Sequence, residues 1–159
     1  MTSVMISIKP KWCELIVSGK KTIEVRKTRP REAVPFKCYI YETQGKTEIP
    51  WMDEDGHMIF KGRGQVIGEF VCDEIYAIDK DSVDWIYKKG NESIYAKEAK
   101  ELCHCISDEE LRSYLGRYIG YGWHISNLVI YDKPKYLSDF MGMKRSPQSW
   151  CYVWENPSL

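Results

Sequence analysis

The segment from Ser18 to Pro30, SGKKTIEVRKTRP, carries charged residues at offsets that suit recognition of a polar ligand. It contains the pattern G-x-K-x-x-E-x-R, formed by Gly19, Lys21, Glu24 and Arg26. Arginine presents a rigid fork of N–H donors to a phosphate or a base edge, and glutamate accepts from exocyclic amines or ribose hydroxyls. A desolvated lysine beside another cation loses its proton more readily, which would let Lys21 act as a base or a nucleophile.

The same charges also have an ordinary structural interpretation. Lys20 and Lys21 follow the expected carboxyl end of a helix, where a cation is stabilised by a few tenths to about 1 kcal/mol. Glu24 and Arg26 are two residues apart on an expected strand, so they share one face of it. That face could be solvated, with the two side chains paired to each other or across the sheet.

The residues around this pattern predict a strand, a helix and a second strand. Residues 4–8 (VMISI) alternate as a strand does, and Pro10 suits the first turn of a helix. Apolar residues at helical spacing predict this helix, namely Trp12, Leu15 and Ile16, and Gly19 is expected to end it. Residues 22–27 (TIEVRK) then form a strand with Ile23 and Val25 on one face and the polar residues on the other.

Further strands are expected at residues 36–42, 65–78, 122–131 and 149–154. Gly68 indicates a bulge or bend in the long strand at 65–78. Residues 43–64 are rich in glycine and charge, and the Asp55-Gly56 turn signal predicts an exposed hairpin or excursion there.

Two helices are expected in the middle of the chain. Asn91 could cap the first, whose inward residues would be Tyr95, Ala99, Leu102 and Ile106. Ser107 and Glu110 form a capping box for the second, which would end near Gly116. The sum is an α+β fold, a small mixed β-barrel of five to six strands with two to three short helices, because helices do not alternate regularly with strands.

Composition restricts the function classes. The chain has 159 residues, 43% hydrophobic, which predicts one domain, and its net charge of zero provides no global field for nucleic acid or membrane. Charge is uneven, however, since residues 1–37 hold nine basic and three acidic side chains while residues 73–110 hold five and eleven. This asymmetry predicts a basic face and an acidic face if the fold keeps the two segments apart.

No segment is typical of a metal site or a membrane span. The six cysteines, at 13, 38, 72, 103, 105 and 151, include no C-x-x-C, and the CHC at 103–105 lacks a second ligand pair. We therefore expect no metal and no cofactor. The absence of a secretory pattern and of a long apolar run predicts no membrane partner and a cytoplasmic protein whose cysteines are thiols.

The charged pattern and its context resemble the ASCH family of PUA-like domains. The pattern directly follows SIKPKWCELIVS, and GEFVCDEI (Gly68–Ile75) and PQSWCYV (Pro147–Val153) look like segments of bacterial and prophage members. The resemblance is clearest over residues 5–26 and 65–76 and weakest over 43–64. It implies that residues 1–159 form one PUA-like β-barrel domain with the excursion at 43–64, and that a cleft between barrel and helix binds RNA, a nucleotide or a nucleoside.

The resemblance also implies where the site residues lie. Lys21, Glu24 and Arg26 would line the cleft, with Ser7 and Lys9 at its mouth. The residues themselves add further candidates: Tyr121 and Trp123, flanked by Gly120 and Gly122, could form an exposed stacking ledge, and Glu69 on the long strand is a second candidate acid. Trp12 fits the inward stripe of the first helix and is expected in the core.

Two further function classes stay open. Some very small ASCH proteins resemble amidohydrolases that remove an acyl group from N4 of acylated cytidine, but a threonine stands in them where this chain has Glu24. Thr22 offers a hydroxyl at a different offset. A metal-independent hydrolase acting on a modified nucleoside or on single-stranded RNA would instead use Lys21 with Glu24, or Tyr121, as its acid and base. Alternatively, acidic helices at 91–116 would dock a basic protein, and this protein-protein interaction class is favoured if the charged pattern lies on a flat surface.

Overall fold

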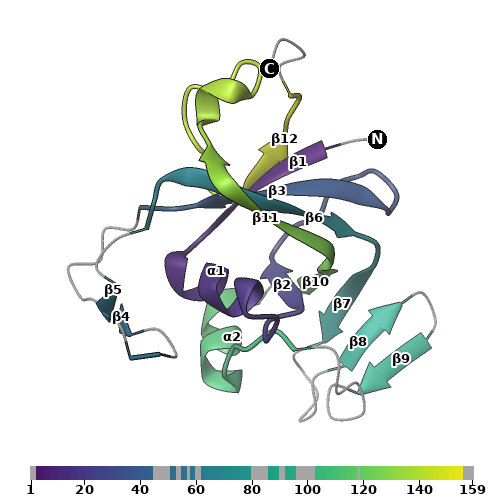
Figure 1. The fold of residues 1–159 in the computed structure, drawn as a ribbon. Coiled ribbons are helices and arrows are strands. Elements are labelled where there is room, and N and C mark those ends of the chain that lie inside the picture. Colours follow the sequence, from purple (N-terminus) through teal and green to yellow (C-terminus); the bar gives the residue numbers. More distant parts are fainter. Residues whose placement is uncertain are drawn as a thin grey trace.

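The structure is a computed structural model that describes residues 3–44, 51–52, 55–56, 58–59, 62–79, 86–89, 92–95, 103–117 and 119–155. Two five-stranded sheets dominate it (Figure 1). The first sheet has the order β11 (Ser126–Lys135), β6 (Gln65–Cys72), β3 (Phe36–Glu42), β1 (Ser3–Ile8) and β12 (Trp150–Tyr152). The second has the order β2 (Ile23–Arg26), β10 (Gly120–His124), β7 (Ile75–Asp79), β8 (Ile86–Lys89) and β9 (Glu92–Tyr95).

The remaining elements are short. The helices are α1 (Pro10–Val17), α2 (Asp108–Leu115) and the 3-10 helix η1 (Leu137–Asp139), and the excursion contains the paired strands β4 (Trp51–Met52) and β5 (Met58–Ile59). The α+β class of the expected PUA-like fold is confirmed. The strands outnumber the five to six predicted, and the ladders between described strands form separate sheets rather than one closed barrel.

The chain passes between the two sheets at two corners. The expected long strand at 65–78 divides into β6 and β7, and the expected strand at 122–131 divides into β10 and β11. The corners are bonded to each other, because His124 N donates to Glu74 O (3.0 Å) and Ser126 Oγ donates to Val71 O (2.8 Å). Each of these two segments therefore supplies one strand to each sheet, and the break at the corner lets the two sheets enclose a core between them.

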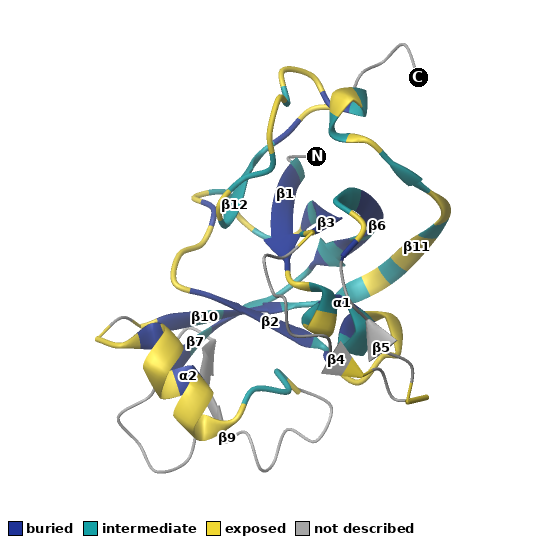
Figure 2. Cartoon of the chain, turned by 90° about the vertical axis from the view of Figure 1, so that its left-hand side faces the viewer, coloured by how far each residue is buried: buried dark blue, intermediate teal, exposed yellow. Residues whose placement is uncertain are grey.

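The core lies between the first sheet, α1 and β10. Buried side chains of β1, β3 and β6 meet Cys13 and Ile16 of α1 and Trp123 of β10. A second cluster joins Ile23 and Val25 of β2 to Leu111 of α2. Figure 2 shows this as dark blue ribbon along β1, β2 and β10, with α2 exposed on its outer side. Thus β2 has packed neighbours although half of its residues are charged.

Most of the local signals in the sequence are confirmed. Pro10 begins α1, Gly19 follows it with φ +80°, and Gly56 has φ +83° between β4 and β5. The capping box of Ser107 and Glu110 starts α2. Gly68 adjoins a bulge in β6. Ile40 of β3 pairs with Gly68, but the next residue, Tyr41, pairs with Val66, so one residue of β6 has no partner between them.

The helix predicted from Asn91 to Ile106 is wrong over residues 92–95. These residues form β9, which pairs antiparallel with β8 and places Tyr95 opposite Ile86. Cross-strand pairing at the edge of the second sheet outweighed a weak helical periodicity. The dipeptide Gly90-Asn91, a hairpin signal, could have predicted this. Asn91, Ala99 and Leu102 lie outside the described residues.

Candidate functional site

The end of α1 directs Lys21 back toward the sheet. Past Ser18, the left-handed Gly19 reverses the chain, and the backbone N–H of Lys21 donates to Leu15 O at 2.9 Å. Glycine adopts this φ without a Cβ penalty. Lys21 is therefore fixed by its own backbone at the junction between α1 and β2, as the glycine stop predicted.

The three charged side chains of the pattern are buried. Lys21 is 2% exposed, Glu24 5% and Arg26 8%. All four residues of β2 are buried, since Ile23 and Val25 pack toward α2 while the charged side chains occupy the opposite face. A solvated face, the ordinary structural interpretation of these charges, is therefore excluded.

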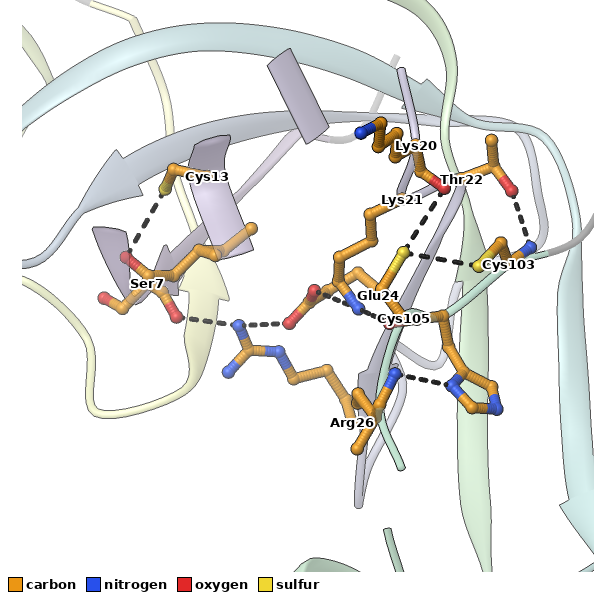
Figure 3. A network of polar contacts seen from close by, with 12 residues as sticks. Ser7, Cys13, Lys20, Lys21, Thr22, Glu24, Arg26, Cys103 and Cys105 are labelled. Carbon is orange, nitrogen blue, oxygen red and sulfur yellow. Dashed lines mark hydrogen bonds and ion pairs between the residues drawn. The ribbon is translucent and has the colours of Figure 1, made fainter. Parts of the chain in front are cut away.

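The buried charges form one network (Figure 3). Lys21 Nζ lies 3.5 Å from Glu24 Oε2, and Arg26 Nη2 lies 3.0 Å from Glu24 Oε1. Lys21 Nζ also donates to the backbone O of His104 at 2.5 Å. One carboxylate thus neutralises one of two buried cations, and the network keeps a net positive charge.

Arg26 joins the two sheets. Its Nη2 donates to Ser7 O on β1 at 2.7 Å, and its Nη1 donates to Ser149 Oγ at 3.4 Å. Ser7 in turn bonds the 147–149 segment, because its N–H donates to Ser149 O (2.9 Å) and its hydroxyl to Pro147 O (2.6 Å). The guanidinium therefore holds β1, β2 and the 147–149 segment in one arrangement.

Two atoms of this network lack hydrogen-bond partners. They are Glu24 Oε2 and Arg26 Nε, both buried. A buried polar atom without a partner costs about 1–3 kcal/mol, and such atoms are uncommon in purely structural ion pairs. The network is therefore incomplete as it stands.

The network forms the base of a cleft of about 690 Å³. Its walls come from β1, α1, β2, α2 and the 147–149 segment; the residues are Ser7, Lys9, Trp12, Lys21, Glu24, Val25, Arg26, Lys27, Thr28, Thr43, Ile106, Glu110, Tyr114, Pro147, Gln148 and Ser149. The volume falls within the roughly 300–1,000 Å³ typical of small-molecule sites. The cleft could therefore hold a nucleotide or one splayed base of a strand.

The cleft brings together Ser7, Lys9, Lys21, Glu24 and Arg26 of the predicted site residues. The exposed ledge predicted for Tyr121 and Trp123 is not formed. Trp123 is fully buried and meets the rings of Phe36 and Trp150 edge-on, with centroids 5.6 and 5.8 Å away. Tyr121 is half-buried against the same core. A Cβ at Gly120 would lie 2.8 Å from Leu115 Cδ1, so this glycine allows α2 to pack closely on the strand.

Glu69 lies outside the cleft, on β6. Its Oε1 is 3.1 Å from Lys37 Nζ, and its Oε2 accepts from the Tyr131 hydroxyl. Burial, and then this hydrogen bond, raise the pKa of Tyr131 well above its usual value. Both carboxylate oxygens have partners, and this carboxylate is separate from the charged network of the cleft.

Two aromatic side chains line the cleft, Trp12, which also packs against the core as expected, and Tyr114, which the sequence analysis did not single out. Trp12, expected in the core, is half-buried and also lines the cleft, with Lys21 Nζ 5.1 Å from its ring centroid. Tyr114 of α2 is 40% exposed and lines the opposite wall. Glu110 and Tyr114 share one helical face four residues apart, and this spacing was the available signal.

The segment of residues 103–106, which contacts Lys21 from a distant part of the sequence, was also not predicted to belong to the site. His104 supplies the carbonyl acceptor for Lys21, and its Nδ1 accepts from Ile106 N at 3.0 Å. Burial and the charge of Lys21 lower the pKa of His104 to about 4, so its ring is neutral near pH 7. The Thr22 hydroxyl accepts from Cys103 N (2.9 Å) and does not line the cleft.

The described part of the chain contains neither a metal-binding cluster nor a membrane-spanning helix. No group of three or more histidine, cysteine or acidic side chains there could hold a metal ion. No helix there has the length and apolar character needed to cross a membrane.

Comparison with known proteins gives the family. The model of the ASCH domain matches residues 6–115. A crystal structure of the ASCH protein from Zymomonas mobilis superposes with a TM-score of 0.64 at 20% identity, covering 96% of this chain and 87% of that one. A point-mutant structure of the same protein gives 0.65 at 20% identity, covering 97% and 91%. No curated protein matches the sequence. The family match extends over the α1–β2 junction, both sides of the cleft and α2, and the chain belongs to the ASCH domain family.

Proposed function

We propose that the cleft binds single-stranded RNA or a free nucleotide. The observation that carries this proposal is the buried network of Lys21, Glu24 and Arg26 at the base of the cleft, with a net positive charge and two polar atoms that lack a hydrogen bond. Burying charged side chains costs several kcal/mol, and well-packed apolar side chains at the bottom of the cleft would stabilise the fold better. A ligand that brings its own phosphate and polar edge would make use of this arrangement.

The cleft offers each contact that a nucleotide needs. Lys9 and Lys27 are exposed cations at its rim, and with Lys21 and Arg26 they outnumber the carboxylates of the cleft by four to two. This excess favours a phosphate. Arg26 would contact the phosphate or a base edge, and Glu24 would accept from an exocyclic amine or a ribose hydroxyl.

Stacking surfaces stand on both sides of the cleft. Trp12 comes from α1 and Tyr114 from α2. Aromatic stacking contributes about 1–3 kcal/mol per base and tolerates any sequence. We therefore place the base between these two side chains, with the backbone toward the lysines of the rim.

Docking of a basic protein fits the geometry less well. The charged pattern lies in a concavity, not on a flat surface. The acidic start of α2 is also close to the basic segment, since Glu110 Oε1 lies 4.0 Å from Lys11 Nζ. The two charged segments therefore meet here instead of forming opposed faces.

One observation supports a second function, hydrolysis of single-stranded RNA or a modified nucleoside. Lys21 and Glu24 are 3.5 Å apart in the cleft, an arrangement suited to general acid and base catalysis. Glu24 would accept the proton of a ribose 2′-hydroxyl or a water, and Lys21 would donate one to the leaving group. The Thr22 hydroxyl plays no part, because it lies outside the cleft.

The test is a titration of end-labelled single-stranded RNA, and of a mononucleotide, with the wild type and Glu24→Gln. Arg26→Lys keeps the charge but removes the fork, and Glu69→Gln is the matched control, a paired strand carboxylate outside the cleft. We expect salt-sensitive binding that Glu24→Gln and Arg26→Lys weaken about tenfold or more and Glu69→Gln leaves unchanged. Equal effects of the two glutamine variants would overturn the proposal.

A denaturing gel of the same samples tests the second function. Shortened RNA that disappears with Lys21→Met but persists with Lys37→Met would establish hydrolysis in this cleft. Intact RNA in every lane would leave binding alone.

A further inference from the structure

Cys103 and Cys105 form a pair of thiols beside the charged network. Their Sγ atoms are 3.3 Å apart, and both side chains lie on the same side of the segment because Cys105 has a left-handed φ of +59°. Cys103 is exposed and Cys105 half-buried, so solvent reaches the pair. Such an arrangement favours reaction of the two sulfurs with each other.

This pair is bonded to the strand that carries the network. Cys103 O accepts from the N–H groups of Thr22 (2.9 Å) and Ile23 (3.0 Å), and Cys105 Sγ donates to Lys20 O at 3.3 Å. The residue between the cysteines is His104, whose carbonyl holds Lys21 Nζ at 2.5 Å. Figure 3 shows the Cys105 sulfur bonded to the Lys20 carbonyl and in contact with the Cys103 sulfur. Any change at the sulfurs therefore acts on the backbone that positions Lys21.

We propose that Cys103 and Cys105 are a thiol–disulfide site that controls the cleft, with peroxides as the reacting class. The exposed Cys103 thiol gives up its proton, and its sulfur attacks one peroxide oxygen; the O–O bond breaks, a sulfenic acid forms, and the leaving hydroxide takes up the released proton to become water. Burial raises the pKa of Cys105 to about 11, so it reacts from the thiol: its sulfur attacks the Cys103 sulfur, the S–O bond breaks, and the leaving hydroxide takes the Cys105 proton to become water. Both sulfurs together lose two electrons to the peroxide, and a thiol reductant reverses the reaction.

The disulfide changes two contacts. Cys105 loses its proton, so Lys20 O loses its donor. The sulfurs must also approach from 3.3 Å to bonding distance, which moves the backbone of His104 between them. Lys21 then loses the geometry of its shortest hydrogen bond. The oxidised protein therefore has a less ordered Lys21 and a weaker ligand site; this last consequence rests on the proposed function, whereas the disulfide and the backbone change do not.

The test begins with the full chain, reduced or treated with hydrogen peroxide. Mass spectrometry of the peptide with residues 103–105 should show the loss of two hydrogens, restored by dithiothreitol. Cys103→Ser and Cys105→Ser should abolish this change, whereas Cys151→Ser, a half-buried cysteine on β12, should not. A trivalent arsenical, which bridges paired thiols, should protect the reduced wild type. Failure of the disulfide to form in folded protein would overturn the proposal.

Two further readouts separate this proposal from the proposed function. Hydrogen exchange needs no ligand, and oxidation should speed exchange of the Thr22 and Ile23 amides about fivefold or more in wild type but not in Cys105→Ser. RNA affinity should fall about fivefold on oxidation and recover on reduction. Unchanged exchange in the oxidised protein would overturn control of the cleft. If oxidation speeds amide exchange but the reduced protein binds no RNA, the thiol–disulfide site is supported. Only the ligand given under the proposed function is then contradicted.

Discussion

Two carboxylates on strands of different sheets are each held between two partners, and they differ in how completely they are hydrogen-bonded. Glu24 lies between Lys21 and Arg26, its side chain 7% exposed, and one of its oxygens has no hydrogen bond. Glu69 lies between Lys37 and Tyr131, its side chain 22% exposed, and both of its oxygens have partners.

The difference separates two uses of charge on a strand. The Glu69 cluster, comprising Lys37, Glu69 and Tyr131, is partly hydrated and fully bonded, as expected of a group that only stabilises the sheet. The cleft network is drier and incomplete, and it lies in a concavity of about 690 Å³. A buried ion pair with incomplete hydrogen bonding is more costly than a partly exposed pair, and this difference supports our proposal that a ligand binds in the cleft.

The largest effect should come from deleting one lysine in each group. Lys21→Met removes the ion pair with Glu24 Oε2 and the donor to His104 O, and it should lower the free energy of unfolding by about 3 kcal/mol because both of these acceptors lose the Lys21 ammonium. Lys37→Met should cost less than about 1 kcal/mol because that side chain is 33% exposed. Urea unfolding followed by fluorescence measures both. Equal losses would remove the contrast between the two groups.

The two groups should also respond to opposite extremes of pH. The pKa of His104 is lowered to about 4, so the unfolded chain binds a proton between about pH 6.5 and 4 that the folded chain does not. Stability should fall through this window on acidification, by roughly 1–2 kcal/mol at pH 5, and His104→Asn, which keeps an acceptor for Ile106 N, should lack this component.

At the Glu69 cluster the sign is reversed. The pKa of Tyr131 is raised by burial and by Glu69, so the folded chain keeps a proton that the unfolded chain loses above about pH 10. Stability should therefore fall as the pH rises past 10, and Tyr131→Phe should reduce this fall. Thermal melts across pH 4–11 test both the acidic and the alkaline loss of stability. If His104→Asn loses as much stability in acid as the wild type, another group is responsible for that loss.

A smaller effect is expected from the aromatic wall. Tyr114→Ala should weaken RNA binding about tenfold through lost stacking, with little change in stability because Tyr114 is 40% exposed. Tyr131→Phe is the control at the Glu69 cluster and should leave affinity unchanged. Fluorescence anisotropy measures both variants. If both bind like wild type, the base does not stack on α2.

The smallest effect is expected at the rim. Lys9→Ala should reduce the slope of log affinity against log salt by about 0.7 for a single strand, because one phosphate contact is lost. Lys135, beside the Glu69 cluster and 3.0 Å from Glu155, is the matched lysine outside the cleft. Lys135→Ala should not change the slope. Equal slopes for both variants would place the phosphates elsewhere.

The residue pattern alone predicted the α1–β2 junction, because its geometry depends on neighbours close in sequence, whereas the five predicted residues of the cleft were implied by the family resemblance. Gly19 ends α1, Lys21 returns to Leu15, and the alternation of β2 puts Glu24 and Arg26 on one side. The caps of α2 and the bulge at Gly68 are of the same kind. Local sterics and hydrogen bonding determine such features before any long-range contact forms.

Other features were decided by contacts between distant segments. Trp123 entered the core because β10 lies between β2 and β7 and its side chain faces the first sheet. Residues 92–95 became a strand because β8 offered an edge.

The complete environment of Lys21 likewise exists only in the folded chain. Its acceptor, His104, is 83 residues away in sequence. Which charged side chains α1 and β2 carry, and on which face, follows from the local sequence. Their burial follows from the packing of the two sheets with α2 and residues 103–106. Water is excluded from these charges because the surfaces that cover them come from all of these segments together.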